Sequence, residues 1–196
     1  MGLKITADDE ALVRRFQTGD EEAFTLLARR WEQPVFHMAY RLLGRTEDAD
    51  EVRQLALLRM HRGLAEFNGD ARVSTWVYRI VANLCRDARR ARESEVRRTR
   101  RVLSERIRTE AVPAEQHDVS DEGDRIGRAM MELPSEIRAV LVLRHYHDMT
   151  FIEIAEVLDL PPTTVRSRAL AGMKQLAEAL GFLNRPGSNG ARGERT

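Results

Sequence analysis

Four side chains with nucleic-acid-binding chemistry share one face of a predicted helix in the first half of the chain. They fall at i, i+4, i+7 and i+11 of the helical repeat, and they are Arg79, Asn83, Arg86 and Arg90. Guanidinium groups pair with phosphates and amides bond to base edges, so a straight line of both suits a nucleic-acid strand. A helix face that only meets water can have the same composition, and the spacing alone leaves both interpretations open.

A short polar loop precedes this helix and adds groups that suit an unpaired base. The loop reads NGDAR, and its small or hydrogen-bonding residues are Asn68, Gly69, Asp70 and Arg72. Loops of this composition can receive bases that have left the stack. Trp76, early in the helix, either stacks on such a base or fills the core.

A second group with the same chemistry follows Pro162. Its members carry hydroxyl or cationic groups, and they are Thr163, Thr164, Arg166, Ser167, Arg168 and Lys174. The stretch before them, TFIEIAEVL, carries acids and no base. This asymmetry is what a DNA-reading helix pair predicts, because only the second helix enters the groove. An ordinary helical hairpin with a solvated basic face is the alternative.

Local signals place this second group on a helix-turn-helix. Thr150 and Glu153 form a capping-box pattern, and Leu160-Pro161-Pro162 ends one helix and starts the next. So short a break forces the two helices to cross steeply. The expected buried stripe of the second helix consists of Val165, Ala169, Met173, Leu176 and Leu180. The cationic and hydroxyl side chains lie mostly off that stripe, and Arg168 is the closest to it.

Helical spacing dominates the rest of the chain as well, and we predict an all-α fold. One helix is expected from a cap at Asp20 to Gly44, with Pro34 kinking or dividing it. Another begins at Thr46 as its cap, and a third is capped by Ser74 or Thr75.

The composition changes in the middle of the chain. Residues 86–108 hold ten arginines against four acids, whereas residues 109–124 hold six acids and no lysine or arginine. Few large apolar residues occur there, which is typical of a linker. The predicted organisation is two small helical domains, residues 8–92 and 123–183. A flexible linker, residues 93–122, connects them and is helical at its start. A disordered tail follows at residues 184–196.

The bulk composition narrows the classes of function. The 196 residues carry a net charge of only +1, so a polyanion has to be bound through local patches. A single cysteine, Cys85, excludes an internal disulfide, and a buried thiol is favoured over a redox sensor. The chain has neither an apolar run of about 20 residues nor the apolar core of a signal peptide. We expect a cytoplasmic protein without membrane insertion.

Enzymatic chemistry is not expected. The sequence has no glycine-rich phosphate loop and no nucleophile motif. His145 and His147 are two residues apart, which on a helix separates their side chains by about 200°, and no third ligand is near in sequence. We therefore predict no catalytic residue, no metal site and no cofactor.

Two stretches together resemble a known family. FNGDARVSTWVYRIVANLCRDARRAR resembles the second region of extracytoplasmic-function (ECF) sigma factors, and LPSEIRAVLVLRHYHDMTFIEIAEVLDLPPTTVRSRA resembles their fourth region. Their order and the intervening linker also match. The resemblance implies a bacterial subunit that binds core RNA polymerase, recognises the promoter minus-10 and minus-35 elements and helps to open the duplex.

The resemblance also implies roles for particular residues. The NGDAR loop and the helix after it correspond to the part that captures a non-template minus-10 base, and the residues after Pro162 to the part that reads the minus-35 duplex. Glu51 and Gln54, at i and i+3, match a pair that docks on a coiled coil of the largest polymerase subunit. Without the resemblance, these two residues read as solvated surface. An anti-sigma factor is a further partner expected of the family.

The chain departs from the family pattern in two places. Leu55 stands where an acid usually follows the glutamine, so either the docking chemistry is altered or Leu55 is core. Ala171-Gly172-Met173 stands where further arginines usually extend the reading helix, which confines the expected minus-35 contacts to 163–168 and Lys174. The rival function is a helix-turn-helix transcription regulator that binds duplex DNA without being a polymerase subunit.

Overall fold

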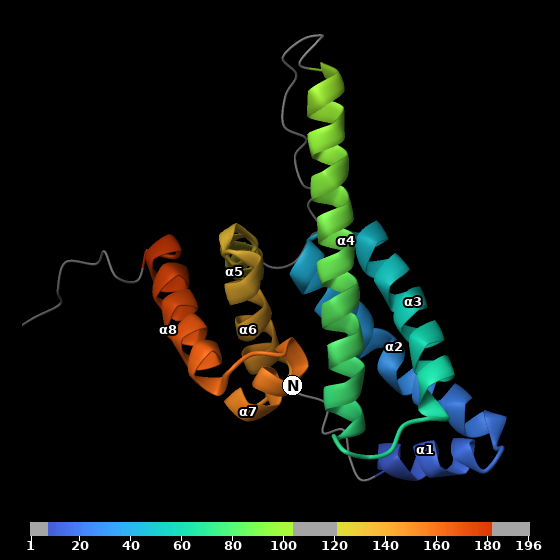
Figure 1. Cartoon of the computed structure of the whole chain (residues 1–196). Helices are drawn as coiled ribbons and strands as arrows, with labels where there is room; N and C mark the ends of the chain where they lie inside the picture. The colour runs from blue at the N-terminus through green and yellow to red at the C-terminus, as the bar shows by residue number, and fades with distance from the viewer. Residues whose placement is uncertain (1–7, 104–120, 182–196) are drawn as a thin grey trace, which may run out of the picture.

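The computed structural model describes residues 8–103 and 121–181, and these contain eight α-helices and no strand (Figure 1). The helices are α1 (Asp8–Gln17), α2 (Glu21–Leu43), α3 (Thr46–Leu64), α4 (Val73–Leu103), α5 (Asp121–Glu132), α6 (Ser135–Tyr146), α7 (Phe151–Leu158) and α8 (Pro162–Ala179). The all-α fold predicted from helical spacing is confirmed for the described residues.

Helices α1 to α4 form the N-terminal bundle. Helices α2 and α3 pack against each other, and α4 contacts both. Their fully buried side chains are mostly aliphatic and include Leu27, Trp31, Met38, Met60 and Leu64. The indole Nε1 of Trp31 donates a hydrogen bond to the Asp9 carboxylate at 3.1 Å, and Arg30 pairs with the same carboxylate. These contacts tie α1 to α2.

Helix α2 begins and ends where the sequence predicts, but it is not divided. The Asp20 carboxylate accepts hydrogen bonds from two backbone N–H groups of the first turn, and Gly44 closes the helix in the left-handed conformation with φ of 76°. The helix continues through Pro34, so the expected division there is wrong. Trp31 and Val35 on either side are fully buried, and this packing outweighs a proline penalty of about 3 kcal/mol.

Two other predicted caps are also wrong. Thr46 is the first helical residue of α3, and Arg45 occupies the cap position without a side-chain hydrogen bond. Helix α4 begins at Val73, ahead of both Ser74 and Thr75. The Thr75 side chain is buried at 1% exposure, so it faces the core and cannot turn back to cap the first turn.

Helices α5 to α8 form the C-terminal bundle, in which α7 and α8 make the helix-turn-helix. The capping box at the start of α7 is present as predicted, because Thr150 and Glu153 bond to each other's backbone N–H. Asp159 ends α7 in the left-handed conformation with φ of 54°, and Pro162 is the first residue of α8. The break between the two helices is therefore three residues long.

The buried stripe of α8 differs from the prediction, since Val165 and Ala169 are buried whereas Leu176 and Leu180 are half-buried. Met173 is 46% exposed, and Gly172 is buried in its place. A Cβ at residue 172 would lie 2.6 Å from Ile137 Cγ2 and 2.9 Å from Leu141 Cδ1, so the missing side chain lets α6 and α8 approach closely. The spacing i, i+4, i+7 from Val165 leads to Gly172, and a pattern that counts only apolar side chains passes over it.

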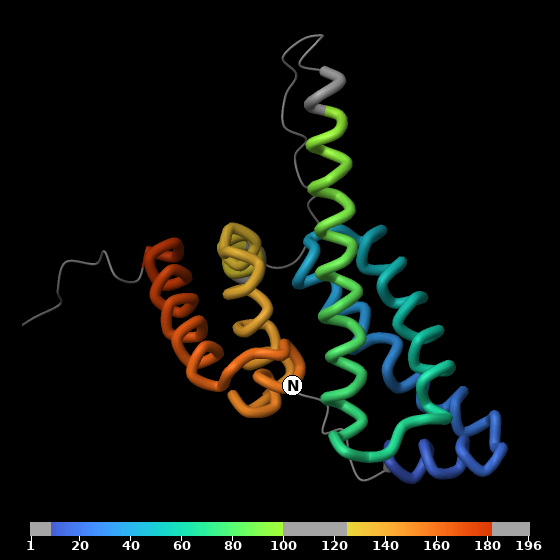
Figure 2. Tube along the Cα trace, viewed as in Figure 1, coloured from blue at the N-terminus to red at the C-terminus, as the bar shows by residue number. Residues whose placement is uncertain are grey.

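The two bundles pack against each other, with α4 between them (Figure 2). Helix α4 contacts α7, and α2 contacts α6, so the buried residues of both bundles form one continuous core. Helix α4 extends to Leu103, and residues 93–103 of the expected linker are therefore helical. Residues 104–120 of that linker and the whole predicted tail, residues 184–196, lie outside the described residues.

Candidate nucleic-acid interface

The predicted stripe of α4 exists as a row of accessible side chains with different partners. Arg79 and Arg90 are exposed, whereas Asn83 and Arg86 are half-buried. Arg86 Nη1 donates to Asn83 Oδ1 at 2.9 Å, which fixes the amide and the guanidinium side by side. Arg79 Nε donates to the backbone carbonyl of Glu156 in α7 at 3.1 Å. The row thus has one internally ordered pair and one cation held by the other bundle.

The loop before α4 is exposed and held by its own polar groups. Asn68 Nδ2 donates to Asp70 Oδ2 at 2.6 Å, and the backbone N–H of Asp70 donates to Asn68 Oδ1 at 3.3 Å. Gly69 between them has φ of 82°, where a side chain would be strained. Arg72 extends from the loop and pairs with Glu153 at 3.1 Å. The loop therefore has a defined shape.

Trp76 packs onto α3. Its ring lies 5.3 Å from that of Phe67 between centroids, and its atom Cζ2 would lie 2.9 Å from a Cβ added at Gly63. Gly63 is thus required for the close approach of this ring. The tryptophan is half-buried against the core, and of the two roles left open by the sequence the packing role is present.

The exposed face of α8 carries most of the second predicted group. Thr163, Arg166, Ser167 and Lys174 are exposed, and Thr164 is half-buried. The Ser167 hydroxyl donates to the carbonyl of Thr164 at 2.9 Å. The guanidinium of Arg166 lies 5.9 Å from the ring centroid of Phe151, which supports it at the start of the helix. These groups point away from the bundle.

Arg168 lies apart from this face. It is half-buried and lines a cavity of about 370 Å³ between the bundles, together with Arg86, Arg89 and Arg90 of α4. The sequence placed Arg168 closest to the buried stripe, and its position agrees with that. The structure therefore separates Arg168 from the exposed side chains of α8.

Sequence reasoning missed two apolar members of the α8 face. Leu170 is 74% exposed and Met173 is 46% exposed. They follow Arg166 at i+4 and i+7, and therefore lie on the same side of the helix. The signal was present in the spacing, but Met173 was assigned to the buried stripe. An apolar patch beside cations suits a thymine methyl group in the major groove.

The exposed face of α3 also differs from an ordinary solvated surface. Glu51 and Gln54 are exposed as expected, and Gln54 Nε2 donates to the Asp50 carboxylate at 2.9 Å. Hydrogen bonds from Arg53 and Gln54 lower the pKa of Asp50. Leu55 and Leu58 are 40% and 55% exposed. Of the two interpretations of Leu55, the core interpretation is therefore wrong.

Two other kinds of site, a metal centre and a reactive thiol, are not formed by the described residues. No group of three or more His, Cys, Asp or Glu side chains in residues 8–103 and 121–181 could hold a metal ion. Cys85 is buried, and burial raises the pKa of its thiol to about 12, so it is an unreactive core residue. None of the helices in these ranges is both long and apolar enough to cross a membrane.

Comparison with known proteins identifies both bundles. The family description Sigma-70 region 2 matches residues 27–95, and Sigma-70, region 4 matches residues 123–176. The ECF RNA polymerase sigma factor SigM of Mycobacterium tuberculosis is 36% identical over 90% of this chain and 86% of its own length. The ECF RNA polymerase sigma-E factor of Escherichia coli is 33% identical over 82% of this chain and 87% of its own.

Solved structures share the fold. CnrH, solved in complex with the cytosolic domain of CnrY, aligns with a TM-score of 0.64 at 24% identity over 89% of this chain and 98% of that one. The sigma factor RpoE of Bartonella quintana, solved with the anti-sigma factor NepR, aligns with a TM-score of 0.60 at 17% identity over 83% of this chain and 98% of that one.

Proposed function

We propose that three surfaces carry out promoter recognition and polymerase binding in this chain, which belongs to the ECF RNA polymerase sigma factors. Members of this family are non-catalytic subunits that act with RNA polymerase in transcription initiation, and a regulator independent of polymerase is thereby set aside. In our proposal residues 8–92 bind polymerase and the minus-10 element, residues 93–122 connect, and residues 123–183 bind the minus-35 element.

The stripe of α4 and the loop before it form the proposed minus-10 surface. The observation that carries this assignment is the row of cations beside a small, polar, Gly-containing loop in the bundle that matches region 2. Phosphates of the non-template strand would pair with Arg72, Arg79, Arg86 and Arg90, while loop 68–70 and Asn83 take an unstacked base. Trp76 contributes the exposed part of its ring as a stacking edge.

The exposed face of α8 is the proposed minus-35 surface. Thr163, Thr164, Arg166, Ser167 and Lys174 supply hydrogen bonds and charge, and we add Leu170 as an apolar contact to a thymine methyl. Arg168 contributes from the edge of this surface, at a phosphate. The support is that these side chains, apart from Thr164 and Arg168, are exposed on the second helix of a helix-turn-helix.

The exposed face of α3 is the proposed polymerase-docking surface. Its polar members are Glu51 and Gln54, and Leu55 and Leu58 give it an apolar centre. Buried apolar side chains within a polar rim are typical of stable protein interfaces. Family membership further supports a cytoplasmic location and an anti-sigma factor as a partner, because CnrH and RpoE were solved with CnrY and an anti-sigma factor.

Strand opening within the holoenzyme tests the proposed function. Substituting both Asn83 and Arg86 with Ala should leave closed-complex formation with core polymerase largely intact, but sharply reduce permanganate reactivity of unpaired thymines. A promoter with a pre-melted bubble should restore run-off transcription, because extruding a base costs a few kcal/mol that the bubble supplies. If the variant opens linear promoter DNA normally, the α4 stripe is not the strand-capturing surface.

A further inference from the structure

The cavity between the bundles is lined by more positive than negative groups. Three of its arginines come from α4 and one from α8, and they are Arg86, Arg89, Arg90 and Arg168. Among the described residues, the acidic groups of the lining are Glu136 and Asp159. Four guanidinium groups against two carboxylates leave an excess of two positive charges in one cavity, although the whole chain carries a net charge of only +1. The local charge therefore favours an anion.

Two of these arginines have no partner. Neither Arg90 nor Arg168 forms a hydrogen bond or an ion pair within the part of the chain that the structure describes. Arg89 is shared, since its Nη2 lies 3.3 Å from Glu136 Oε1 and its Nε lies 3.8 Å from Glu93 Oε1. Arg168 is half-buried, and a cation withdrawn from water without a counter-charge costs free energy. An anion bound in the cavity would remove that cost.

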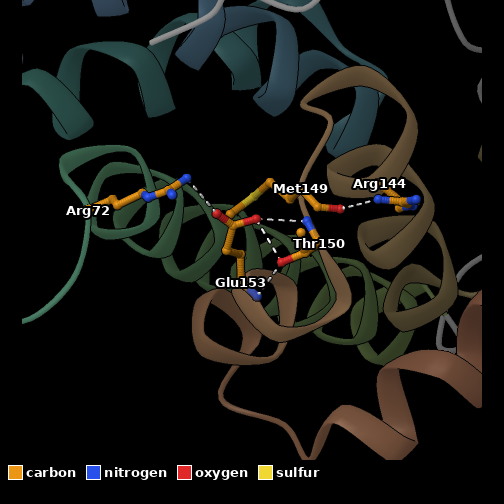
Figure 3. Close-up of polar contacts among 5 residues, drawn as sticks. All are labelled: Arg72, Arg144, Met149, Thr150 and Glu153. Carbon is orange, nitrogen blue, oxygen red and sulfur yellow. Dashed lines mark hydrogen bonds and ion pairs between the residues drawn. The ribbon is translucent and has the colours of Figure 1, made fainter. Parts of the chain in front are cut away.

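Elsewhere in the contact between the bundles, arginines do have acceptors. Arg72 Nη1 lies 3.1 Å from Glu153 Oε1, and Figure 3 shows the two side chains pointing toward each other. The backbone N–H and the hydroxyl of Thr150 hold the same carboxylate in place, each at 2.8 Å. Arg79 Nε donates to the backbone carbonyl of Glu156 at 3.1 Å. The unpaired arginines of the cavity therefore differ from the other cations at this contact.

The remaining walls of the cavity are mostly apolar, and their aliphatic members are Leu42, Leu43, Ala82, Ala139, Leu158 and Leu160. Cys85 also lines the cavity, and its thiol is uncharged because burial raises the pKa to about 12. Ser135, the first residue of α6, adds a hydroxyl group at the positive end of that helix. A ligand that fits these walls has an anionic part for the arginines and an apolar part for the leucines.

We propose that this cavity binds a nucleoside polyphosphate. Guanidinium groups bind phosphate oxygens through paired N–H donors, so several arginines suit a chain of phosphates. The apolar walls suit the flat base, and the volume of about 370 Å³ falls within the range of about 300–1,000 Å³ that is usual for small-molecule sites. Arg90 and Arg168, which lack partners, are assigned to the phosphates.

The proposed site shares residues with the surface proposed for the minus-10 strand, because Arg86 and Arg90 belong to both. A bound nucleotide and single-stranded DNA would exclude each other, since both place phosphates at the same guanidinium groups. This consequence, unlike the site itself, rests on the function proposed for α4. It would make strand binding by this chain sensitive to the nucleotide concentration.

Isothermal titration calorimetry of the full chain with GTP, at constant ionic strength, tests the site. Arg168→Ala should weaken GTP binding by at least about tenfold, because a charge-assisted contact to phosphate is lost. Arg97→Ala, at an exposed position of α4 outside the cavity lining, removes the same charge and should leave the affinity unchanged. The inference is overturned if the wild type shows no saturable binding, or if both variants weaken it equally.

Glu136→Gln provides a test that a folding defect cannot imitate. A hydrogen bond from its own backbone N–H, with Arg89 nearby, lowers the pKa of Glu136, so its carboxylate is charged at neutral pH and repels an anion. Glutamine removes that charge and releases Arg89, so GTP should bind more tightly by about threefold or more. Glu132→Gln, at an exposed position of α5 outside the cavity lining, is the matched control. Glu136→Gln binding no more tightly than this control would refute the site.

Two simpler ligands show which parts of the nucleotide are bound. Inorganic triphosphate lacks the base and sugar, and guanosine lacks the phosphates. Each should bind at least about tenfold more weakly than GTP, because each contacts only one kind of wall. If inorganic triphosphate binds as tightly as GTP, the assignment of a nucleoside ligand is wrong.

Fluorescence anisotropy of a labelled single-stranded DNA oligonucleotide tests the overlap with α4. GTP should displace the strand from the wild-type chain, and Arg168→Ala should require at least about tenfold more GTP for the same displacement, in line with its weaker binding. If GTP binds in calorimetry as expected but leaves the strand in place, the nucleotide site stands and the function proposed for α4 fails.

Discussion

At residue 172 the absence of a side chain sets the spacing between α6 and α8. Alanine is the better helix former by about 1 kcal/mol, so propensity alone predicts that Gly172→Ala stabilises the protein. The Cβ would lie 2.6 Å from Ile137 Cγ2 and 2.9 Å from Leu141 Cδ1, and overpacking of this kind costs about 1–3 kcal/mol. We expect a net loss in the free energy of unfolding, measured by chemical denaturation.

Gly127 in α5 is the matched control. An added Cβ there meets no atom within 4 Å, so Gly127→Ala should stabilise the protein by up to about 1 kcal/mol. If both substitutions stabilise, the packing of α6 on α8 yields more easily than the distances indicate. The pair of variants isolates what the sequence pattern missed, because both glycines lie within helices and only one lies under a neighbouring helix.

Leu170 allows a test of apolar contact with DNA, which the arginines of α8 do not allow. Leu170→Ala should weaken binding to a minus-35 duplex by about 1 kcal/mol, through loss of an apolar contact to a thymine methyl. The side chain is 74% exposed, so the fold should persist. Replacing the contacted thymine by uracil should cost the wild type a similar amount and the variant nothing further. Additive losses in equilibrium binding would show that Leu170 does not contact that methyl group.

At the scale of the helix, the exposed face of α3 should act as a unit. Substituting Glu51 and Gln54 with Ala should weaken binding to core polymerase with little change in stability, since exposed substitutions typically change it by less than about 0.5 kcal/mol. Leu58→Ala should also weaken it, because that side chain is 55% exposed and gains burial only in the complex. Glu66→Ala, also exposed, is the control. Unchanged polymerase affinity, measured by surface plasmon resonance, would place docking elsewhere.

The helix starts show which parts of the fold can be predicted from local sequence alone. The caps at Asp20 and Thr150 were predictable because their chemistry is complete within four residues. The start of α4 was not, because Thr75 is drawn into the core by packing with distant helices. The exposed cationic faces of α4 and α8 could be predicted from helical spacing. The exposure of Leu170 on the same face as Arg166 became clear only from the position of the buried stripe of α8 in the structure.

At the scale of the whole molecule, the packing of one bundle on the other was beyond the sequence pattern. Helix α4 is buried on two sides, because Val77 and Val81 are fully buried in the core and Tyr78, at 4% exposure, faces His147 of the other bundle. A second apolar contact surface widens the buried face of a helix, but the apolar residues keep the same helical repeat. The spacing in the sequence therefore does not show that a second contact exists. The acids of α7 likewise gave no indication of their partner, since Arg72 precedes Glu153 by 81 positions.

Because His147 lies at the junction of the bundles, its titration should make the free energy of unfolding depend on pH. Burial, together with Arg41 and His37 of α2, lowers the pKa of His147 to about 4, and nearby Asp148 has a weaker opposing effect. The Tyr78 hydroxyl of α4 faces the His147 ring. In the unfolded chain the pKa is about 6.5. Between these values the unfolded state binds the proton and the folded state does not, so stability falls as the pH drops below about 6.5.

The expected loss from pH 7 to pH 5 is on the order of 2 kcal/mol for this one group, measured as the free energy of unfolding in urea. His147→Gln is the reference variant, because its amide keeps an acceptor for the Tyr78 hydroxyl but does not titrate. Carboxylates whose pKa is lowered, such as Glu136 and Asp20, lose their contribution mainly below this window. His37, whose pKa is also lowered, remains in both proteins and cancels in the comparison. Suppose that the free energy of unfolding changes with pH by the same slope in the wild type and the variant over this range. That result would mean that His147 can take up a proton without parting the bundles, and that its neighbours do not exclude the charged form.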